Sequence, residues 1–525
     1  MREYIKAMSD EYSEYLKDES RNIGKADGIA FPQDEKQLIA ILKQAYSSGK
    51  PITIQGARTG LAAGAVPDGG LIINLSRMNK VLGLSRDESG RFYANLQPGV
   101  VLSKLRELIT SKSFDTEGWP VSSLLVFEDF KSFREQFFTC DPTESSCTIG
   151  GMVACNASGA RSYLYGSVRP HVTALKVILA DGRSLKIKRG EVFAKGRRLS
   201  LTLDSEDVLE LSLPAFKMPD TKNASGYYIA DNMDAIDLFI GSDGTLGIIT
   251  EIELALIDAP GIIWGVAYFF ESEHDAISFV EKMREIKNIA AIEYFDNRAL
   301  DILRNAKHEM GAFSKLPDII PNRVCIYIEI HCSDEESAEE LLIESADIME
   351  SCGGNEEDSW ACCNKADLEK LIFFRHAAPE CVNMIIAERK RTDPVITKLS
   401  TDFAVPHEHF RKIISIYHEQ LRELSLEYAI WGHIGDSHVH VNVLARNAAE
   451  HTRTKELFAD WACIVSEMGG TVSAEHGVGK LKSAFLKTMY GEHHIIEMAK
   501  LKSIFDPLGL LGAGNMFIPI QESKQ

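Results

Sequence analysis

The chain has 525 residues, of which 45% are hydrophobic and 25% charged, and its formal net charge at pH 7 is −19. This length exceeds what one hydrophobic core usually supports, so we expect two or three domains. The acidic balance argues against nucleic acid as a partner, because nucleic-acid phosphates favour basic surfaces. It does not exclude a local basic pocket for a small anion.

The N-terminus lacks the features of a secretion signal. Residues 1–17 mix charged and apolar side chains and contain no continuous apolar core. No apolar run approaches the length that spans a membrane. The ten cysteines include no Cys-x-x-Cys pair, which is consistent with buried thiols in a reducing compartment. We expect a cytoplasmic protein and leave open a peripheral attachment to the inner face of the membrane.

The first half of the chain alternates short strands and helices. Apolar residues at helical spacing predict a helix over residues 34–46, followed by strands over 50–54 and 71–75. Residues 175–183 predict a strand that runs into a hairpin turn. Residues 121–138, rich in Phe and charge, are typical of an insertion that contains one short helix.

The pattern changes near residue 258. Strand-like runs at 265–270 and 323–330 alternate with charged amphipathic helices at 274–287 and 334–349. This alternation predicts an α+β sheet covered by helices on one face. A further helix, over residues 407–424, leads into a segment rich in histidine.

Three loops of small residues are spread across the first half. They cover residues 56–67, 148–159 and 241–250. Small residues allow a backbone to approach a pyrophosphate closely and to direct several N–H groups at its oxygens. The first loop is neither the Gly-x-Gly-x-x-Gly nor the P-loop pattern, which disfavours a nicotinamide site and an NTPase. One such loop could be an ordinary turn, whereas three separated loops indicate a long ligand.

A histidine-rich segment, residues 432–442, and a second segment, residues 473–480, carry the clearest chemistry. His438 and His440 are two residues apart, so an extended strand would place them on the same face. Imidazoles together with a carboxylate such as Glu475 suit a divalent ion such as zinc. A single histidine is more often a satisfied polar residue, but this grouping favours a site.

Taken together, these motifs resemble the FAD-linked oxidases of the vanillyl-alcohol oxidase (PCMH-type) superfamily. Within it they are most similar to the branch of D-lactate, glycolate and D-2-hydroxyglutarate dehydrogenases. The motifs that carry the resemblance are the three loops, the two histidine-containing segments, Asp141-Pro142-Thr143 and Phe505-Asp506-Pro507. The resemblance implies an α+β fold with a two-part PCMH-type FAD-binding domain, an antiparallel-sheet substrate-binding cap domain and a C-terminal segment that carries the metal and catalytic motifs. We place these parts at residues 1–257, 258–425 and 426–525.

The resemblance implies a non-covalent FAD, because no His or Cys lies within residues 55–60, where related enzymes can attach flavin. The residues expected to bind the cofactor are Gly56, Ala57, Arg58, Thr59, Gly60, Asp141, Pro142, Thr143, Gly150, Gly151, Asn156, Gly159, Tyr165, Gly166, Gly247, Ile248, Ile249 and Asn515. Arg58 departs from the branch, which has a small residue there. Its cation could pair with phosphate or point outward.

The same resemblance assigns roles at the histidine segment. His433, His440 and Glu475 are the expected ligands of a divalent metal, with Zn²⁺ as the expected ion. His438 stands where the branch commonly has Asn, and we expect it to contact the ligands or the substrate. His476 is the expected catalytic base. Arg375 and Lys398 are the expected cations for a substrate carboxylate, although a surface salt bridge is the ordinary alternative for each.

These assignments imply an FAD-dependent dehydrogenase that oxidises a D-2-hydroxy acid, similar to D-lactate, to the 2-oxo acid. The hydride would pass to flavin N5, while the metal and His476 would activate the hydroxyl. A quinone, an electron-transferring flavoprotein or a cytochrome would then accept the electrons. The substrate's side chain and a homodimeric state are left open.

Other functions compete with this one. A zinc hydrolase could use the same histidines and Glu475 to activate water, but it leaves the three loops unexplained. A flavin oxidase or synthase acting on an aryl alcohol or an ether lipid would not need the metal ligands. A cofactor-free binding or scaffold protein would not need the intact loops, Arg375 or Lys398.

Overall fold

A small, mostly parallel sheet begins the chain of the computed structural model, which describes residues 4–517. Its order is β1-β2-β4-β3, with β3 and β2 both parallel to β4. The strands are β1 (Ile5–Ala7), β2 (Gly28–Ala30), β4 (Leu71–Asn74) and β3 (Ile52–Gln55). Helix α1 (Glu35–Ser48) packs its apolar face on this sheet, and the Asp34 side chain caps its N-terminus. The helix and the two strands predicted for this region are confirmed.

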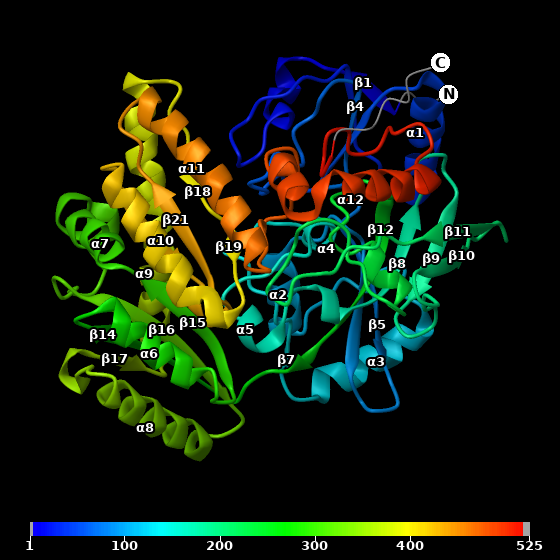
Figure 1. Cartoon of the computed structure of the whole chain (residues 1–525). Coiled ribbons are helices and arrows are strands. Elements are labelled where there is room, and N and C mark those ends of the chain that lie inside the picture. Colours follow the sequence, from blue (N-terminus) through cyan, green and yellow to red (C-terminus); the bar gives the residue numbers. More distant parts are fainter. Residues whose placement is uncertain (1–3, 518–525) are drawn as a thin grey trace.

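A second sheet lies in the same body and is antiparallel. Its order is β5-β6-β12-β8-β9. The strands are β5 (Val81–Arg86), β6 (Phe92–Leu96), β12 (Ile248–Ala255), β8 (Val172–Ile178) and β9 (Ser184–Lys188). β8 and β9 pair as a hairpin with Ile178 opposite Ser184, so the predicted turn is confirmed. The two sheets form the two-part body on the right of Figure 1.

One helix of this first body lies in the insertion predicted at residues 121–138. Residues 121–138 form the one predicted helix, α3 (Val121–Ser132), and also a short strand, β7 (Gln136–Phe137), which was not predicted. β7 pairs with β13 (Ile257–Asp258). Buried residues of α2 (Leu102–Ser111), α3 and α4 (Ile149–Cys155) share one hydrophobic core with the second sheet. The β10–β11 hairpin (Arg198–Thr202, Val208–Ser212) joins this core.

The second body is built on an eight-stranded sheet whose strand pairs are antiparallel. Its order is β17-β14-β16-β15-β20-β21-β18, and β19 also pairs with β21. The strands are β17 (Trp360–Cys362), β14 (Ile262–Phe270), β16 (Val324–Cys332), β15 (Ile289–Phe295), β20 (Tyr428–Gly432), β21 (His438–Val443), β18 (Leu399–Ser400) and β19 (Phe403–Ala404). This sheet lies on the left of Figure 1, and we call it the cap sheet; most of its strands come from residues 258–425, the predicted cap, but β20 and β21 lie beyond that range.

Helices cover both faces of the cap sheet, so the prediction of one covered face was wrong. One core includes α6 (Glu273–Met283), α8 (Glu335–Ser351), α10 (Phe410–Glu423) and α11 (Ala448–Glu467). The core on the other face includes α7 (Asn297–Glu309) and α9 (Lys365–Thr392). The reason is visible in β16, whose nine residues are all buried. A strand buried along its whole length needs a cover on each side.

The end of the chain is divided between the two bodies. β20 and β21 complete the cap sheet, whereas α12 (Ser483–Phe505) packs into the core of the first body. Residues 426–525, predicted as a separate segment, are therefore not a unit of their own. Leu511 forms a bridge with Ile52, which brings the end of the chain beside the first sheet. Among residues 4–517, no helix combines the length and apolar character needed to cross a membrane.

Candidate active site

A deep cleft runs through the first body, between the three loops of small residues. Its lining contains most of the residues predicted to bind the cofactor: Gly56, Ala57, Arg58, Thr59, Gly60, Pro142, Thr143, Gly150, Gly151, Gly159, Gly247, Ile248, Ile249 and Asn515. Glu475 and His476 also line it. The loops therefore share one cavity with Glu475 and His476, whereas Arg375 and Lys398 are not among its lining residues.

The first loop presents unpaired backbone donors to this cleft. Among residues 4–517, the N–H groups of residues 57–60 donate to no protein acceptor. Arg58 has a φ of 64°, in the left-handed region that few residues adopt without a reason. Successive N–H groups around such a residue form a concave site that suits an anion. This arrangement fits the pyrophosphate of FAD.

The Arg58 guanidinium lies over the ring of Tyr15, 4.3 Å from its centroid. Of the two alternatives raised by the sequence, the structure therefore shows the side chain stacked on an aromatic ring. The backbone of this loop, and not the cation, is what the cleft offers to a phosphate.

The glycines of the cleft divide into two kinds. A Cβ at Gly159 would lie 1.8 Å from the Asp141 carbonyl oxygen, and one at Gly150 would lie 2.4 Å from Pro98 Cβ. These two glycines are required by packing within the protein. A Cβ at Gly151 would meet only Thr148 Oγ1, at 3.2 Å, and one at Gly60 would meet nothing within 4 Å. Gly60 therefore leaves open space, and Gly151 has Thr148 Oγ1 as its one close neighbour, so a ligand can approach both.

Four residues predicted to contact the cofactor lie outside the cleft lining. Asp141 pairs with Arg106 Nη2 at 3.0 Å, and the Tyr165 hydroxyl lies 2.7 Å from His331 Nδ1. Asn156 ends α4 with a φ of 51°, and Gly166 ends α5 (Ser162–Tyr165) with a φ of 76°. In this structure they hold the loops in place behind the lining.

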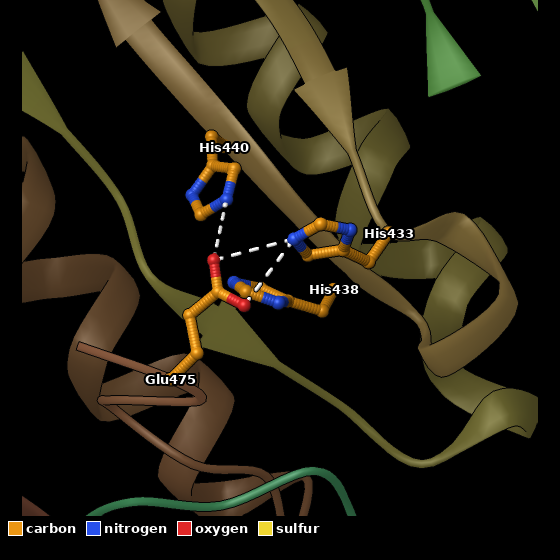
Figure 2. A group of neighbouring side chains, drawn as sticks. All are labelled: His433, His438, His440 and Glu475. Atoms are coloured by element: carbon orange, nitrogen blue, oxygen red, sulfur yellow. Dashed lines mark hydrogen bonds and ion pairs between the residues drawn. The ribbon is translucent and has the colours of Figure 1, made fainter. Parts of the chain in front are cut away.

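A cluster of three imidazoles and a carboxylate lies at the cap side of the cleft. His433, His438, His440 and Glu475 each offer a ligand atom, and these atoms all lie within 4.8 Å of one another (Figure 2). Glu475 Oε2 is 3.2 Å from His433 Nε2, and Oε1 is 3.3 Å from His440 Nε2. The three predicted ligands are brought together, and His438 joins them.

The β20–β21 hairpin positions the histidines. β20 ends at Gly432, a 3-10 turn spans Ile434–Asp436, and Ser437 has a φ of 52°. β21 then begins at His438, and His440 pairs with Trp431. The His438 and His440 rings have centroids 4.6 Å apart, which confirms that they point to the same face.

Two charged residues that the sequence did not reveal adjoin the cluster. Glu293 Oε1 lies 2.7 Å from His433 Nδ1, which leaves His433 Nε2 facing Glu475. The buried Lys222 ammonium lies 3.0 Å from Glu475 Oε2 and 3.7 Å from Asp436 Oδ2. Burial alone would raise the pKa of Glu475, but Lys222 and His433 hold it well below its ordinary value. Glu475 is therefore ionised, as a metal ligand must be.

Asp402 organises the loop that carries Glu475 and His476. Its Oδ2 accepts hydrogen bonds from Lys482 Nζ at 2.5 Å, from Ser473 Oγ at 2.9 Å and from the His476 backbone N–H at 3.1 Å. The same oxygen lies 3.4 Å from His476 Nδ1. The His476 ring stacks beside His440, with centroids 5.5 Å apart.

Arg375 lies in a buried charge network between the two bodies. It comes from α9, and its Nη1 is 4.0 Å from Glu329 Oε2. Arg161 of the first body binds the other oxygen of Glu329 at 2.5 Å. Arg375 Nε is buried and has no hydrogen-bond partner among the described residues. Glu293 acts electrostatically on both Arg375 and His433, which places the arginine near the cluster.

Lys398 is half-buried, immediately before β18. Within the part of the chain that the structure describes, no carboxylate lies within ion-pair distance of its ammonium. Burial, together with the positive charge of Arg21, lowers the pKa of Lys398 to about 8. No contact within residues 4–517 joins Lys398 to the histidine cluster, so its role at the substrate stays a prediction.

The hydrogen bonding of the His438 ring nitrogens shows whether the cluster suits a metal ion. Both ring nitrogens of His438 are buried; among the described residues Nδ1 has no hydrogen-bond partner, and Nε2 lies 3.0 Å from Asp402 Oδ1. Buried polar groups are normally paired, so an unpaired imidazole nitrogen beside two further imidazoles and a carboxylate suits a divalent ion.

Comparison with known protein families covers most of the chain. Residues 26–116 and 131–188 match the FAD binding domain family, and residues 265–516 match the family described as FAD linked oxidases, C-terminal domain. The gap between the two parts of the first match spans most of α3.

Several curated proteins are similar along nearly their full length. The D-lactate dehydrogenase of Archaeoglobus fulgidus is 26% identical over 490 residues, which cover 93% of this chain and 90% of that protein. The D-2-hydroxyglutarate dehydrogenase of Stutzerimonas stutzeri is 25% identical over 521 residues, with 97% and 95% covered. The glycolate oxidase subunit GlcD of Bacillus subtilis is 25% identical over 501 residues, with 94% and 89% covered.

Among solved structures, one of alkyldihydroxyacetonephosphate synthase superposes with a TM-score of 0.61 at 14% sequence identity. It covers 98% of this chain and 82% of that one. This likeness supports the PCMH-type fold, and at this identity it concerns the fold alone.

Proposed function

We propose that this chain, which belongs to the FAD-linked oxidases and is an oxidoreductase, oxidises a D-2-hydroxy acid to the corresponding 2-oxo acid. The observation that carries the proposal is that Glu475 and His476 line the same cleft as the three glycine loops. A substrate held at the histidine cluster would therefore lie against a cofactor held by the loops. The names of the similar proteins, all acting on hydroxy acids, support the substrate class.

The loops would hold a non-covalent FAD. The N–H groups of residues 57–60 suit its pyrophosphate, and the lack of a side chain at Gly151 lets the cofactor approach the backbone. When bound, FAD supplies the acceptor for the hydride that leaves C2 of the substrate. The electrons would pass on to a quinone, an electron-transferring flavoprotein or a cytochrome.

His433, His440 and Glu475 would hold a divalent ion, with Zn²⁺ as the expected ion. When bound, such an ion supplies a positive charge that lowers the pKa of a substrate hydroxyl. Glu293 fixes the orientation of His433, and the Thr401 carbonyl oxygen lies 3.0 Å from His440 Nδ1. Each of these two histidines therefore keeps its Nε2 directed at the cluster, an arrangement typical of metal-bound imidazoles.

His476 would take the hydroxyl proton. Burial lowers the pKa of His476 to about 4, so its imidazole is neutral near pH 7 and can accept a proton. Nδ1 lies 3.4 Å from Asp402 Oδ2, so a proton on Nδ1 would face that carboxylate. Nε2 lies 3.5 Å from Glu475 Oε1, and its lone pair would serve the substrate once Glu475 holds the ion. Asp402 would thus set the tautomer that the base needs.

Arg375 and Lys398 would bind the substrate carboxylate. Arg375 Nε is a buried donor without a partner, and Lys398 is a cation without a neighbouring carboxylate within the described residues. Charge-assisted hydrogen bonds from such groups both bind an anion and orient its C2 atom. These two residues would also explain how a chain of net charge −19 attracts an acid.

Anaerobic mixing of the FAD-loaded protein with a panel of D- and L-2-hydroxy acids tests this proposal. We expect D-lactate or a D-2-hydroxydicarboxylate to bleach the visible flavin absorbance, and the L-enantiomers to be much slower. The matching alcohols without a carboxylate serve as controls and should leave the flavin oxidised. Bleaching by a neutral alcohol as fast as by the acid would refute the proposed substrate class.

A further inference from the structure

We propose that His438 is a fourth protein ligand of the metal, so that this chain binds its ion through three imidazoles and one carboxylate. The inference rests on the metal site of the proposed function and adds one residue to it. Four ligand atoms, from His433, His438, His440 and Glu475, lie within 4.8 Å of one another. Imidazole nitrogens and carboxylate oxygens are both ligand types that zinc accepts.

The environment of His438 calls for a partner. The residue is fully buried, with 0% of its surface exposed. Among residues 4–517, its Nδ1 has no hydrogen-bond partner, whereas its Nε2 lies 3.0 Å from Asp402 Oδ1. A buried donor or acceptor left unpaired is destabilising, and native structures rarely retain one without a reason. The His433 and His440 rings lie beside it, at centroid distances of 5.4 and 4.6 Å, so an ion shared with them would satisfy the unpaired Nδ1 of His438.

The backbone aims this side chain at the cluster. His438 is the first residue of β21, and its backbone pairs with Ala404 of β19. It lies two residues before His440, so both side chains leave the same face of the strand. Figure 2 shows the His438 ring beside the Glu475 carboxylate, with His440 and His433 around it. No rearrangement of the backbone is therefore needed for His438 to join the other ligands.

Asp402 stands behind His438. Its Oδ1 lies 3.0 Å from His438 Nε2, and no other group in the described part of the chain bonds that oxygen. Its Oδ2 is fixed by Lys482 and Ser473. A carboxylate that contacts one nitrogen of an imidazole, while the other nitrogen binds a metal, is a recurrent arrangement in metalloproteins. Asp402 would therefore orient His438 as a ligand in the way that Glu293 orients His433.

The alternative is that His438 only fills space beside a three-ligand site. The related branch commonly has Asn at this position, so His438→Asn replaces the imidazole with a residue compatible with the fold. His451→Asn is a matched control, because His451 is also buried (3% exposed) but bonds Thr397 away from the cluster. A background of His493→Asn with His494→Asn removes the other described histidine cluster, on the surface of α12.

Zinc binding measured by competition with a fluorescent chelator tests the inference, with bound FAD and thermal unfolding reporting on the fold. In the His493→Asn, His494→Asn background, we expect His438→Asn to weaken zinc affinity by at least about tenfold. The His451→Asn control should leave it unchanged. Unchanged affinity in a folded His438→Asn protein would overturn the inference.

A second test needs no change at His438. In the same background, X-ray absorption at the zinc edge measures how many imidazoles bind the ion. The protein for this measurement also carries His476→Asn, because His476 is grouped with Asp402 and Glu475 as a further possible ligand. Three imidazoles in its zinc shell would support the inference, and two would overturn it even if the His438→Asn protein failed to fold. Protein that holds FAD but takes up no zinc would overturn the metal site of the proposed function, and His438 as a ligand with it. The two failures are therefore distinguishable.

Discussion

Gly151 provides the sharpest test of how the cleft holds its cofactor. It lies in α4 and lines the cleft, and a Cβ there would meet only Thr148 Oγ1 at 3.2 Å. In a helix Gly is about 1 kcal/mol, and Val up to about 0.7 kcal/mol, less favourable than Ala. Gly151→Val should therefore change the stability of the FAD-free protein by less than about 0.5 kcal/mol.

The effect on FAD should be much larger. The branched side chain would occupy the space through which a phosphate approaches the backbone. Loss of one hydrogen bond to a charged group costs roughly 1.5–3 kcal/mol. This energy corresponds to a dissociation constant for FAD that is roughly tenfold to 150-fold higher. Titrating FAD-free protein with FAD, followed by flavin fluorescence, measures this constant directly, and thermal unfolding measures the stability.

Two further glycines make the comparison decisive. A Cβ at Gly311, in the cap, would meet nothing within 4 Å, so Gly311→Val should alter neither property. Gly159→Ala should destabilise the FAD-free protein, because its Cβ would lie 1.8 Å from the Asp141 carbonyl oxygen. Gly151→Val protein that is stable and binds FAD as tightly as the unmodified chain would refute the reasoning about the cleft.

The remaining predictions concern the substrate and the metal. Arg375→Ala should keep FAD but lower kcat/KM for the hydroxy acid by about a hundredfold or more, measured by anaerobic flavin reduction, and a smaller loss would argue against a role in orientation. The pKa of Lys398 is about 8, so its positive charge is present below that pH and lost above it. kcat/KM should therefore fall as the pH rises through about 8, and Lys398→Arg should remove this limb; a limb that persists has another origin. A chelator should stop turnover while FAD stays bound, and full activity in protein shown by elemental analysis to be metal-free would contradict the metal's role. Lys222→Met should lower the melting temperature of the metal-free protein, because it removes the cation nearest to the buried Glu475 carboxylate and leaves His433 alone to offset that charge; an unchanged melting temperature would show that the lysine is dispensable.

Features that depend on neighbouring residues could be predicted from the sequence. The helix at α1 and the β8–β9 hairpin follow from apolar spacing and turn residues. The common face of His438 and His440 follows from the period of a strand. The loops around Gly56 and Gly151 were recognisable because close backbone approach needs small residues.

Features that depend on tertiary structure could not be predicted in this way. Lys222, Glu293 and Asp402 are single charged residues in ordinary surroundings, and only the folded chain buries them beside the cluster. The second covered face of the cap sheet was missed because the sequence pattern of α7 and α9 does not show on which face of the sheet each helix packs. The role of His438 was left open because sequence spacing does not show whether a buried nitrogen has a partner.

The path of the chain has a consequence for how the protein is made. Residues between β13 and Thr471 form the cap, while α12 and Asn515 return to the first body. Asn515 Nδ2 donates to the Gly64 and Asp243 carbonyl oxygens, both at 3.1 Å, and it lines the cleft. Domains generally fold as units while the chain leaves the ribosome. The cap is continuous and can fold during synthesis, whereas the flavin cleft lacks a wall until nearly the whole chain has emerged. We therefore expect nascent chains that end before α12 to take up no FAD, so that cofactor loading follows the completion of translation.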